Sequence, residues 1–283
     1  MDESKIISVI DEIKSKYGEN SIRFLGHSEK RHILKVSTGI EDLDAIIGGG
    51  IPRGRLTEIY GVESSGKTSL AMHIASKFEK SVYINMEDFL EDDRLKMFGL
   101  KDDQMIIHDS LNFGEEAYEL MIKYANAGMP LIILDSVPNL ISKNVYEEKN
   151  PEKQSRADVA RLNSRLLPRL IAPCDKNGTS LIFINQARDD LGGMLFGDPV
   201  KTMGGHMLKH LASLRIKMTR KQWLKIGNDM MGQITKVVIK KSKVCSPGGI
   251  AELPLIFSHG FCKVEEIKKI VTDIRKKERK VKK

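Results

Sequence analysis

The chain has 283 residues, of which 41% are apolar and 30% are charged, and its formal net charge is +8. This length and composition predict one large globular domain, or a core with small appendages. No stretch approaches the ~18 consecutive apolar residues of a membrane-spanning helix, and the first residues lack the pattern of a secretory signal. Three scattered cysteines without C-x-x-C spacing favour a reducing compartment. We therefore expect a cytoplasmic protein with no membrane contact, no disulfide framework and no cysteine zinc site.

The positive charge is concentrated in the C-terminal part of the chain. Residues 1–214 sum to −5, whereas residues 215–243 sum to +8 and residues 263–283 to +6. Such an asymmetry favours a surface that binds a polyanion such as nucleic acid. A charged face that only contacts solvent would have the same composition, so charge alone leaves both interpretations open.

In chain order, residues 5–17 have the apolar spacing of an amphipathic helix, and a polar linker follows up to residue 35. From residue 55 onward strands and helices alternate, which predicts a parallel sheet with helices on both faces. The expected strands are 55–60, 81–85, 131–135, 180–185 and 213–218, and the expected helices are 68–79, 114–126 and 156–171. Pro168 should kink or end the third of these helices. Residues 233–240 and 251–257 have no helix between them and predict antiparallel strands that extend the sheet.

Residues 61–68, Gly-Val-Glu-Ser-Ser-Gly-Lys-Thr, form a complete G-x-x-x-x-G-K-[ST] phosphate-binding loop between an expected strand and an expected helix. In such a P-loop the backbone N–H groups and the helix N-terminus bind phosphate, a lysine reaches the β- and γ-phosphates, and a hydroxyl binds Mg²⁺. Lys67 and Thr68 take these last two roles. The predicted nucleotide-binding residues of the loop are Glu63, Ser64, Ser65, Gly66, Lys67, Thr68 and Ser69.

Two carboxylates follow expected buried strands. Asp135 comes directly after four apolar residues, where a P-loop protein needs a carboxylate for its magnesium shell, although an aspartate there can also simply form a turn. Hydrolysis also needs a base or a group that orients water, and Glu87 follows the strand 81–85. The carboxylates at positions 88, 91, 92 and 93 are alternatives on spacing alone.

Gln186 ends another apolar strand, at the place where a γ-phosphate sensor would have to lie. Two irregular stretches, 142–155 and 189–203, follow two of these strands, and a long glycine-bearing loop is either functional or disordered. His206 and His210 have the i, i+4 spacing of two metal ligands, but no third ligand accompanies them, so we expect no metal site there.

A series of short motifs occurs in the order and approximate spacing of one family. They are Val36–Gly39, Leu43–Asp44, Pro52–Arg55, Glu58–Gly61, Glu63–Thr68, Phe183–Gln186 and Thr202–Gly205. On these residues the chain resembles the bacterial RecA family of ATP-dependent DNA recombinases over nearly its whole length. The resemblance implies an α/β fold: a RecA-like P-loop NTPase core with a mostly parallel twisted sheet flanked by helices, plus a separate N-terminal helix. It implies ATP and Mg²⁺ as cofactors.

The resemblance also assigns roles to residues. It implies that Glu87 is the catalytic glutamate and that Gln186 couples the γ-phosphate to loops at 144–156 and 188–204, which line a DNA channel. It implies that Lys241 and Lys243 touch the nucleotide of the neighbouring subunit, like arginine fingers. The implied DNA-binding residues are Lys153, Arg156, Arg188, Gly204 and Gly205.

At the level of the whole chain, the resemblance implies a helical filament that binds single-stranded and double-stranded DNA in the cytoplasm of a bacterial or phage-infected cell. Residues 1–35 would form an N-terminal oligomerisation helix with its linker, packed on the adjacent protomer. Residues 36–262 would form the ATPase core with its DNA-binding loops, and residues 263–283 a basic C-terminal helix or tail.

Two features depart from the family pattern. Arg94 stands where the family stacks a tyrosine on adenine, and its planar guanidinium can also stack on a base. The residues after 262 do not resemble the family's C-terminal domain with its acidic tail, and we expect the basic residues after 274 to bind duplex DNA instead. Two rival functions remain open: a RecA-fold mediator that binds DNA or other recombinases without exchanging strands, and a small-molecule kinase with a P-loop.

Overall fold

The computed structural model describes residues 2–22, 24, 33–87, 92–147, 156–189 and 200–273. The chain divides into two compact units, residues 1–33 and residues 34–283. The first unit contains helix α1 (Glu3–Tyr17) and a single 3₁₀ turn, η1 (Glu19–Ser21). The second unit contains the sheet and every other described helix. Within these described ranges no helix is long and apolar enough to cross a bilayer.

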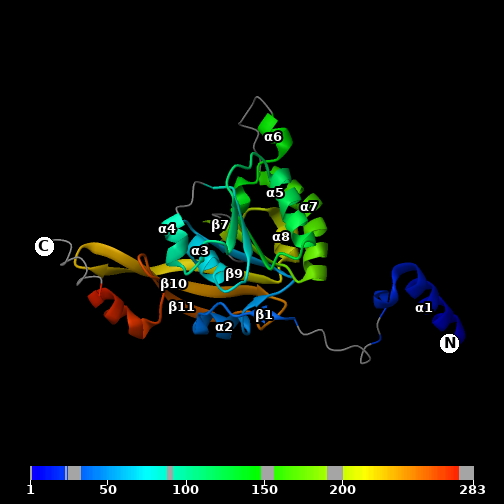
Figure 1. Cartoon of the computed structure of the whole chain (residues 1–283), viewed down its shortest axis with the longest axis horizontal. Coiled ribbons are helices and arrows are strands. Elements are labelled where there is room, and N and C mark those ends of the chain that lie inside the picture. Colours follow the sequence, from blue (N-terminus) through cyan, green and yellow to red (C-terminus); the bar gives the residue numbers. More distant parts are fainter. Residues whose placement is uncertain are drawn as a thin grey trace. The chain divides into compact units, whose positions relative to one another are not determined.

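The second unit is built around a sheet of ten described strands in the order β12-β11-β10-β9-β3-β7-β6-β4-β5, with β8 paired to β7 (Figure 1). The strands from β9 to β5 are parallel, and β10, β11 and β12 continue the sheet as antiparallel strands. Their bounds are β3 (Leu56–Gly61), β4 (Ser81–Asn85), β5 (Met105–His108), β6 (Leu131–Asp135), β7 (Ser180–Asp189), β8 (Val200–Thr202), β9 (Leu214–Ile226), β10 (Asp229–Ser242), β11 (Ile250–Ile256) and β12 (Gly260–Phe261). A separate antiparallel pair joins β1 (Lys35–Val36) to β2 (Ile51–Pro52).

Helices cover both faces of the sheet. Their bounds are α2 (Glu41–Ile47), α3 (Lys67–Ala75), α4 (Asp92–Met97), α5 (Gly114–Asn126), α6 (Lys143–Glu147), α7 (Arg156–Asn177) and α8 (Gly205–Leu211), with the 3₁₀ turns η2 (Val137–Asn139) and η4 (Val264–Glu266). Residues 267–273 are helical as well.

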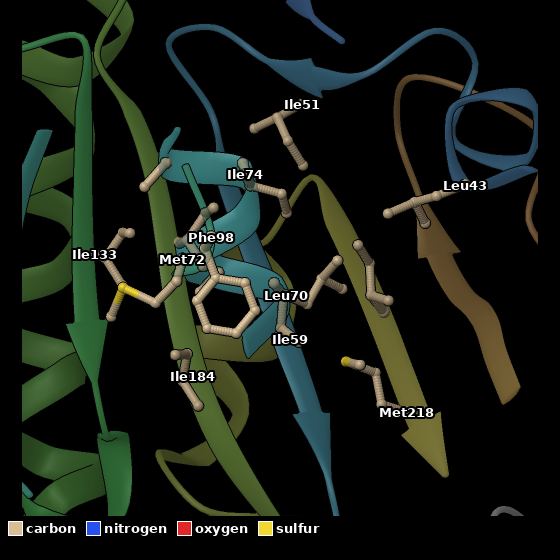
Figure 2. Packing of buried hydrophobic residues seen from close by; sticks show 14 of the residues in the cluster. Leu43, Ile51, Ile59, Leu70, Met72, Ile74, Phe98, Ile133, Ile184 and Met218 are labelled. Atoms are coloured by element: carbon tan, nitrogen blue, oxygen red, sulfur yellow. The ribbon is translucent and has the colours of Figure 1, made fainter. Parts of the chain in front are cut away.

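Each face of the sheet has its own hydrophobic cluster, because successive side chains of a strand point to opposite faces. In β6, Leu131 and Ile133 join the cluster with α2 and α3, whereas Ile132 and Leu134 join the cluster with α5, α7 and α8. Figure 2 shows the first cluster, in which Leu70 and other side chains of α3 lie against the strands. The helix that follows the P-loop is therefore held rigidly on the sheet.

The mostly parallel sheet with helices on both faces confirms the expected fold class, and the strands at 81–85 and 131–135 have the predicted bounds. The expectation that the helix could end at Pro168 was wrong, because α7 continues through Pro168 and Pro173 to Asn177. Pro168 has no N–H to donate to the carbonyl of Ser164, four residues earlier. Both residues are exposed, so water can bind that carbonyl. The buried residues Leu166, Leu167 and Leu170 hold the helix on the sheet.

Candidate nucleotide-binding site and its link to the DNA loops

The P-loop connects β3 to α3 with a backbone that its residue types permit. Ser64 and Gly66 have positive φ values of 56° and 88°, and α3 begins at Lys67. A Cβ atom added to Gly61 would lie 2.1 Å from the backbone oxygen of Met218 on β9, so only glycine fits there. The hydroxyl of Thr235 on β10 donates a hydrogen bond to the Ser65 carbonyl (3.2 Å). A strand from the antiparallel part of the sheet thus holds the P-loop in place.

The predicted magnesium ligands lie together. The Thr68 hydroxyl donates a hydrogen bond to Asp135 Oδ2 (2.8 Å), and the Tyr83 hydroxyl donates a second one to the same oxygen (2.7 Å). Asp135 is 2% exposed, and its Oδ1 has no hydrogen-bond partner among the described residues. Burial raises the pKa of the Asp135 carboxyl to about 6, while the bonds from Tyr83 and Thr68 act in the opposite direction. An oxygen-only set of one hydroxyl and one buried carboxylate suits Mg²⁺ with its retained waters.

Glu87 lies beside this group. Because β4 and β6 are adjacent parallel strands, residues that follow them meet at the same edge of the sheet. The Ser136 hydroxyl donates a hydrogen bond to Glu87 Oε1 (2.5 Å), and the Glu87 N–H donates to Asn85 Oδ1 (3.1 Å). The Glu87 side chain is exposed. Burial lowers the pKa of Lys67, an effect that the charges of Asp135 and Glu87 oppose. The four predicted groups Lys67, Thr68, Glu87 and Asp135 thus form one cluster.

Gln186 is connected to the P-loop by strand register. It stands opposite Gly61 in the β3–β7 pairing, at the carboxyl edge of the sheet. The next residues of β7 pair with β8, in the register Ala187–Thr202 and Arg188–Lys201. The segment that the resemblance assigns to DNA binding therefore begins on β7, the neighbour of the P-loop strand, and returns on β8, which pairs with β7.

A buried network joins the P-loop strand to the end of this segment. Asn185 Nδ2 donates hydrogen bonds to Glu58 Oε1 and to the Met203 carbonyl, both at 2.8 Å. Arg215 Nε donates to Glu58 Oε2, and Arg215 Nη2 donates to the Thr202 hydroxyl (3.3 Å). Because Glu58 is completely buried, its charge depends on Arg215 for compensation.

Gly204 and Gly205 have packing requirements of their own. Both have positive φ values, 92° and 78°. An added Cβ at Gly204 would lie 2.8 Å from Asn163 Nδ2, and one at Gly205 would lie 2.7 Å from Ala160 Cβ. Asn163 Nδ2 also donates a hydrogen bond to the Gly204 carbonyl (3.0 Å). The two glycines let α8 start close against α7, whether or not they also contact DNA.

Lys241 and Lys243 lie far from the P-loop of their own chain. Lys241 Nζ donates hydrogen bonds to the carbonyls of Lys209 (2.6 Å) and His210 (2.8 Å) at the C-terminal end of α8, and Lys243 Nζ donates to His210 (3.0 Å). Lys241 is six residues from Thr235 on β10, the residue that contacts the P-loop. Six residues of strand span about 20 Å.

Several predicted site residues fall wholly or partly outside the described residues. Lys153 lies outside them altogether. Arg94, Arg156 and Arg188 belong to described elements, but their side chains are not described. Their assigned contacts with adenine or DNA stay predictions. Within the described ranges, no group of three or more His, Cys, Asp and Glu side chains could hold a metal ion, and His206 and His210 form no such site.

The sequence did not single out several residues that shape this site. Tyr83 and Ser136 bind the two predicted carboxylates, Thr235 supports the P-loop, and Arg215 compensates Glu58. Tyr83 carries a weak signal, since it is a polar-ended residue inside an apolar strand that precedes Glu87. Arg215 lies between the buried residues Leu214 and Ile216, but Lys217 follows in the same alternating pattern, so the pattern does not distinguish Arg215. Neither pattern identifies a partner, because each partner is tens of residues or more away in the chain.

The comparisons with known proteins agree on one family. The sequence profile described as the RecA N-terminal domain matches residues 4–262. The chain belongs to the RecA family. Protein RecA of Mycoplasmopsis pulmonis is 37% identical over 270 residues, covering 93% of this chain and 78% of that protein. Protein RecA of Aquifex aeolicus is 35% identical, with coverages of 94% and 78%.

A solved structure, of the RadB recombinase, superposes with a TM-score of 0.60 at 21% identity, covering 79% of this chain and 97% of that one. This similarity confirms the fold. Membership of the RecA family gives the chain a recombinase role and, in general terms, ATP and DNA binding with ATPase activity.

Proposed function

We propose that this RecA-family chain is an ATP-dependent homologous DNA recombinase that forms a helical filament on single-stranded DNA. The filament would pair that strand with homologous duplex DNA and exchange strands, with DNA-stimulated ATP hydrolysis. The observation that carries the proposal is the cluster of Lys67, Thr68, Glu87 and Asp135 at the P-loop, on a sheet whose next strand leads directly into the predicted DNA loop.

The residues of the cluster divide the chemistry of hydrolysis among them. Lys67 and the N–H groups around Gly66 bind the phosphates, and Thr68 with Asp135 would hold Mg²⁺, which neutralises charge on the phosphate oxygens. Glu87 accepts a proton from, or orients, the attacking water. The Ser136 hydroxyl fixes the Glu87 carboxylate by its hydrogen bond to Oε1, so that the second oxygen, Oε2, can face that water.

The lysine pair supports action between subunits. Lys241 lies about 20 Å along β10 from the P-loop contact at Thr235, and Lys243 follows just beyond the end of that strand, so neither lysine reaches the nucleotide of its own chain. Both lysines donate hydrogen bonds to carbonyls at the C-terminal end of α8, the helix that follows the predicted DNA loop. In a filament they would enter the neighbouring site and stabilise negative charge in the transition state, an effect worth ~10³- to 10⁵-fold in rate for a trans-acting cation.

A strand-exchange assay with ATP tests the proposal. The full chain should convert a circular single strand and a homologous linear duplex into exchanged products, and Lys67→Ala should abolish the reaction because the β- and γ-phosphates lose their cation. DNA-stimulated ATPase activity without any exchange would contradict the proposal and favour the mediator function. ATPase activity that DNA does not change would contradict both.

A further inference from the structure

A buried asparagine lies in the apolar cluster that α5, α7 and α8 form with the sheet. Asn163 on α7 is completely buried, and its neighbours on the helix, Leu162, Leu166 and Leu167, belong to that cluster. An amide in such surroundings opposes folding unless its donor and its acceptor are both hydrogen-bonded. Burial alone would favour a leucine at this position, so the contacts of the amide have to explain why a polar residue occupies it.

Both ends of the Asn163 amide are hydrogen-bonded. The Tyr118 hydroxyl on α5 donates to Oδ1 (2.6 Å), and Nδ2 donates to the Gly204 carbonyl (3.0 Å). Tyr118 is completely buried as well, and its ring packs edge-to-face on Phe183 of β7, with 6.5 Å between the ring centroids. Burial raises the pKa of the Tyr118 hydroxyl, so it remains a donor. Because this donor occupies Oδ1, the amide N–H₂ group faces the carbonyl.

Three consecutive residues at the end of the predicted DNA loop, 188–204, are each hydrogen-bonded by a side chain of another element. The pairs are Thr202 with Arg215 of β9, Met203 with Asn185 of β7, and Gly204 with Asn163 of α7. Glu58 binds the first two of these side chains, whereas Tyr118 binds the third. The return of the loop to the core is thus fixed from two sides, by the strands next to the P-loop and by α7.

We propose that Asn163 is a positioning residue for DNA-stimulated ATP hydrolysis. It holds the Gly204 carbonyl, so that DNA binding acts on the β7–β8 pair beside Gln186 and does not move the start of α8. This deepens the proposed function and rests on it. β8 pairs with β7 directly after Gln186, with Thr202 opposite Ala187. If Gly204 were free to move, α8 and β8 could shift together and leave Gln186 in place.

The double variant Asn163→Leu/Tyr118→Phe tests this inference in the full chain with ATP and Mg²⁺. It removes the amide and the hydroxyl together, so neither side chain leaves an unpaired polar group in the apolar cluster. The maximal rate of hydrolysis on saturating single-stranded DNA should fall about 2- to 10-fold, the factor that corresponds to one buried hydrogen bond. Three quantities should stay unchanged, because a completely buried residue touches neither ligand: the rate without DNA, the Kd of ATP, and the Kd of a labelled oligodeoxythymidylate without nucleotide.

Asn177→Leu is the matched control on the same helix. The Asn177 amide also donates to a backbone carbonyl of α5, that of Ala125 (2.8 Å), but it lies about 21 Å along α7 from Asn163. This variant should leave the stimulation by DNA unchanged. Tyr118→Phe alone keeps the ring in the core and removes only the bond that orients the amide. It should give a smaller loss of stimulation, and it replaces the double variant if circular dichroism shows that the double variant does not fold.

Two results would show that the inference is wrong while the proposed function stands. One is a maximal DNA-stimulated rate that the double variant, or Tyr118→Phe in its place, shares with the wild type. The other is an equal loss of stimulation in that variant and in Asn177→Leu, since the amide would then contribute to stability alone. If DNA does not stimulate hydrolysis by the wild type, the inference and the proposed function are both wrong.

Discussion

Removing one partner of the buried ion pair Glu58–Arg215 should strongly lower the free energy of unfolding. Arg215→Met removes the guanidinium and leaves a carboxylate whose side chain is 0% exposed, with Arg215 itself only 13% exposed. Asn185 still donates one hydrogen bond to Glu58 Oε1, but no cation remains to compensate the charge. Breaking a buried pair in this way costs about 3–5 kcal/mol. At about 2–4 °C per kcal/mol for a domain of this size, Tm should fall by about 6–20 °C.

Chemical denaturation followed by far-UV circular dichroism measures this loss. The matched control is Lys221→Met, on the same strand, which breaks the Lys221–Glu252 pair at 2.6 Å. Those side chains are 50% and 43% exposed, so the free energy of unfolding should fall by about 1 kcal/mol or less. A loss no larger for Arg215→Met than for this control would refute the reasoning.

A double-mutant cycle separates the charge effect from lost packing. Glu58→Gln keeps the shape of the side chain and removes its charge, so the double variant Glu58→Gln/Arg215→Met should be more stable than Arg215→Met alone. If the two single effects simply add, the residues do not interact energetically, and the network from the P-loop strand to Thr202 loses its physical basis.

Three further predictions concern turnover, subunit cooperation and pH. Glu87→Gln should retain ATP binding and reduce hydrolysis by at least ~10²-fold, because the amide cannot accept a proton; unchanged steady-state ATPase activity would exclude Glu87 as the catalytic base. Lys241→Ala should reduce hydrolysis while the isolated protomer keeps its nucleotide affinity, and small amounts of wild-type subunits should rescue more than their own share if the lysine acts in trans. Burial of His73, with a smaller effect of the Lys77 charge, lowers its pKa from 6.5 to about 4. Protonation then opposes folding, so stability should fall by about 1–2 kcal/mol, allowing for partial exposure, as pH falls from about 6.5 to about 4. His73→Gln should flatten this part of the stability profile in urea unfolding, and an equal slope in both proteins would contradict the assignment.

Much of the nucleotide site could be predicted because its signals are local. The P-loop is eight consecutive residues, and its geometry depends on glycines that a sequence displays directly. Asp135 was predicted because an apolar run followed by a carboxylate marks the end of a buried parallel strand, whereas only the resemblance to the family distinguished Glu87 from the carboxylates at 88, 91, 92 and 93. The structure brings both to Lys67 and Thr68, since adjacent parallel strands end at one edge of the sheet.

The sequence by itself thus determined the fold class, the phosphate-binding loop and the family, through short-range patterns and their order along the chain. Only the tertiary structure decided which distant side chains contact the P-loop and the buried carboxylates. Arg215 compensates Glu58 from 157 positions away, and Thr235 contacts the Ser65 carbonyl of the P-loop from 170 positions away, because β9 lies between β3 and β10 in the sheet. Such contacts depend on strand order and register, which arise from the packing of the whole sheet, so no local stretch of sequence encodes them.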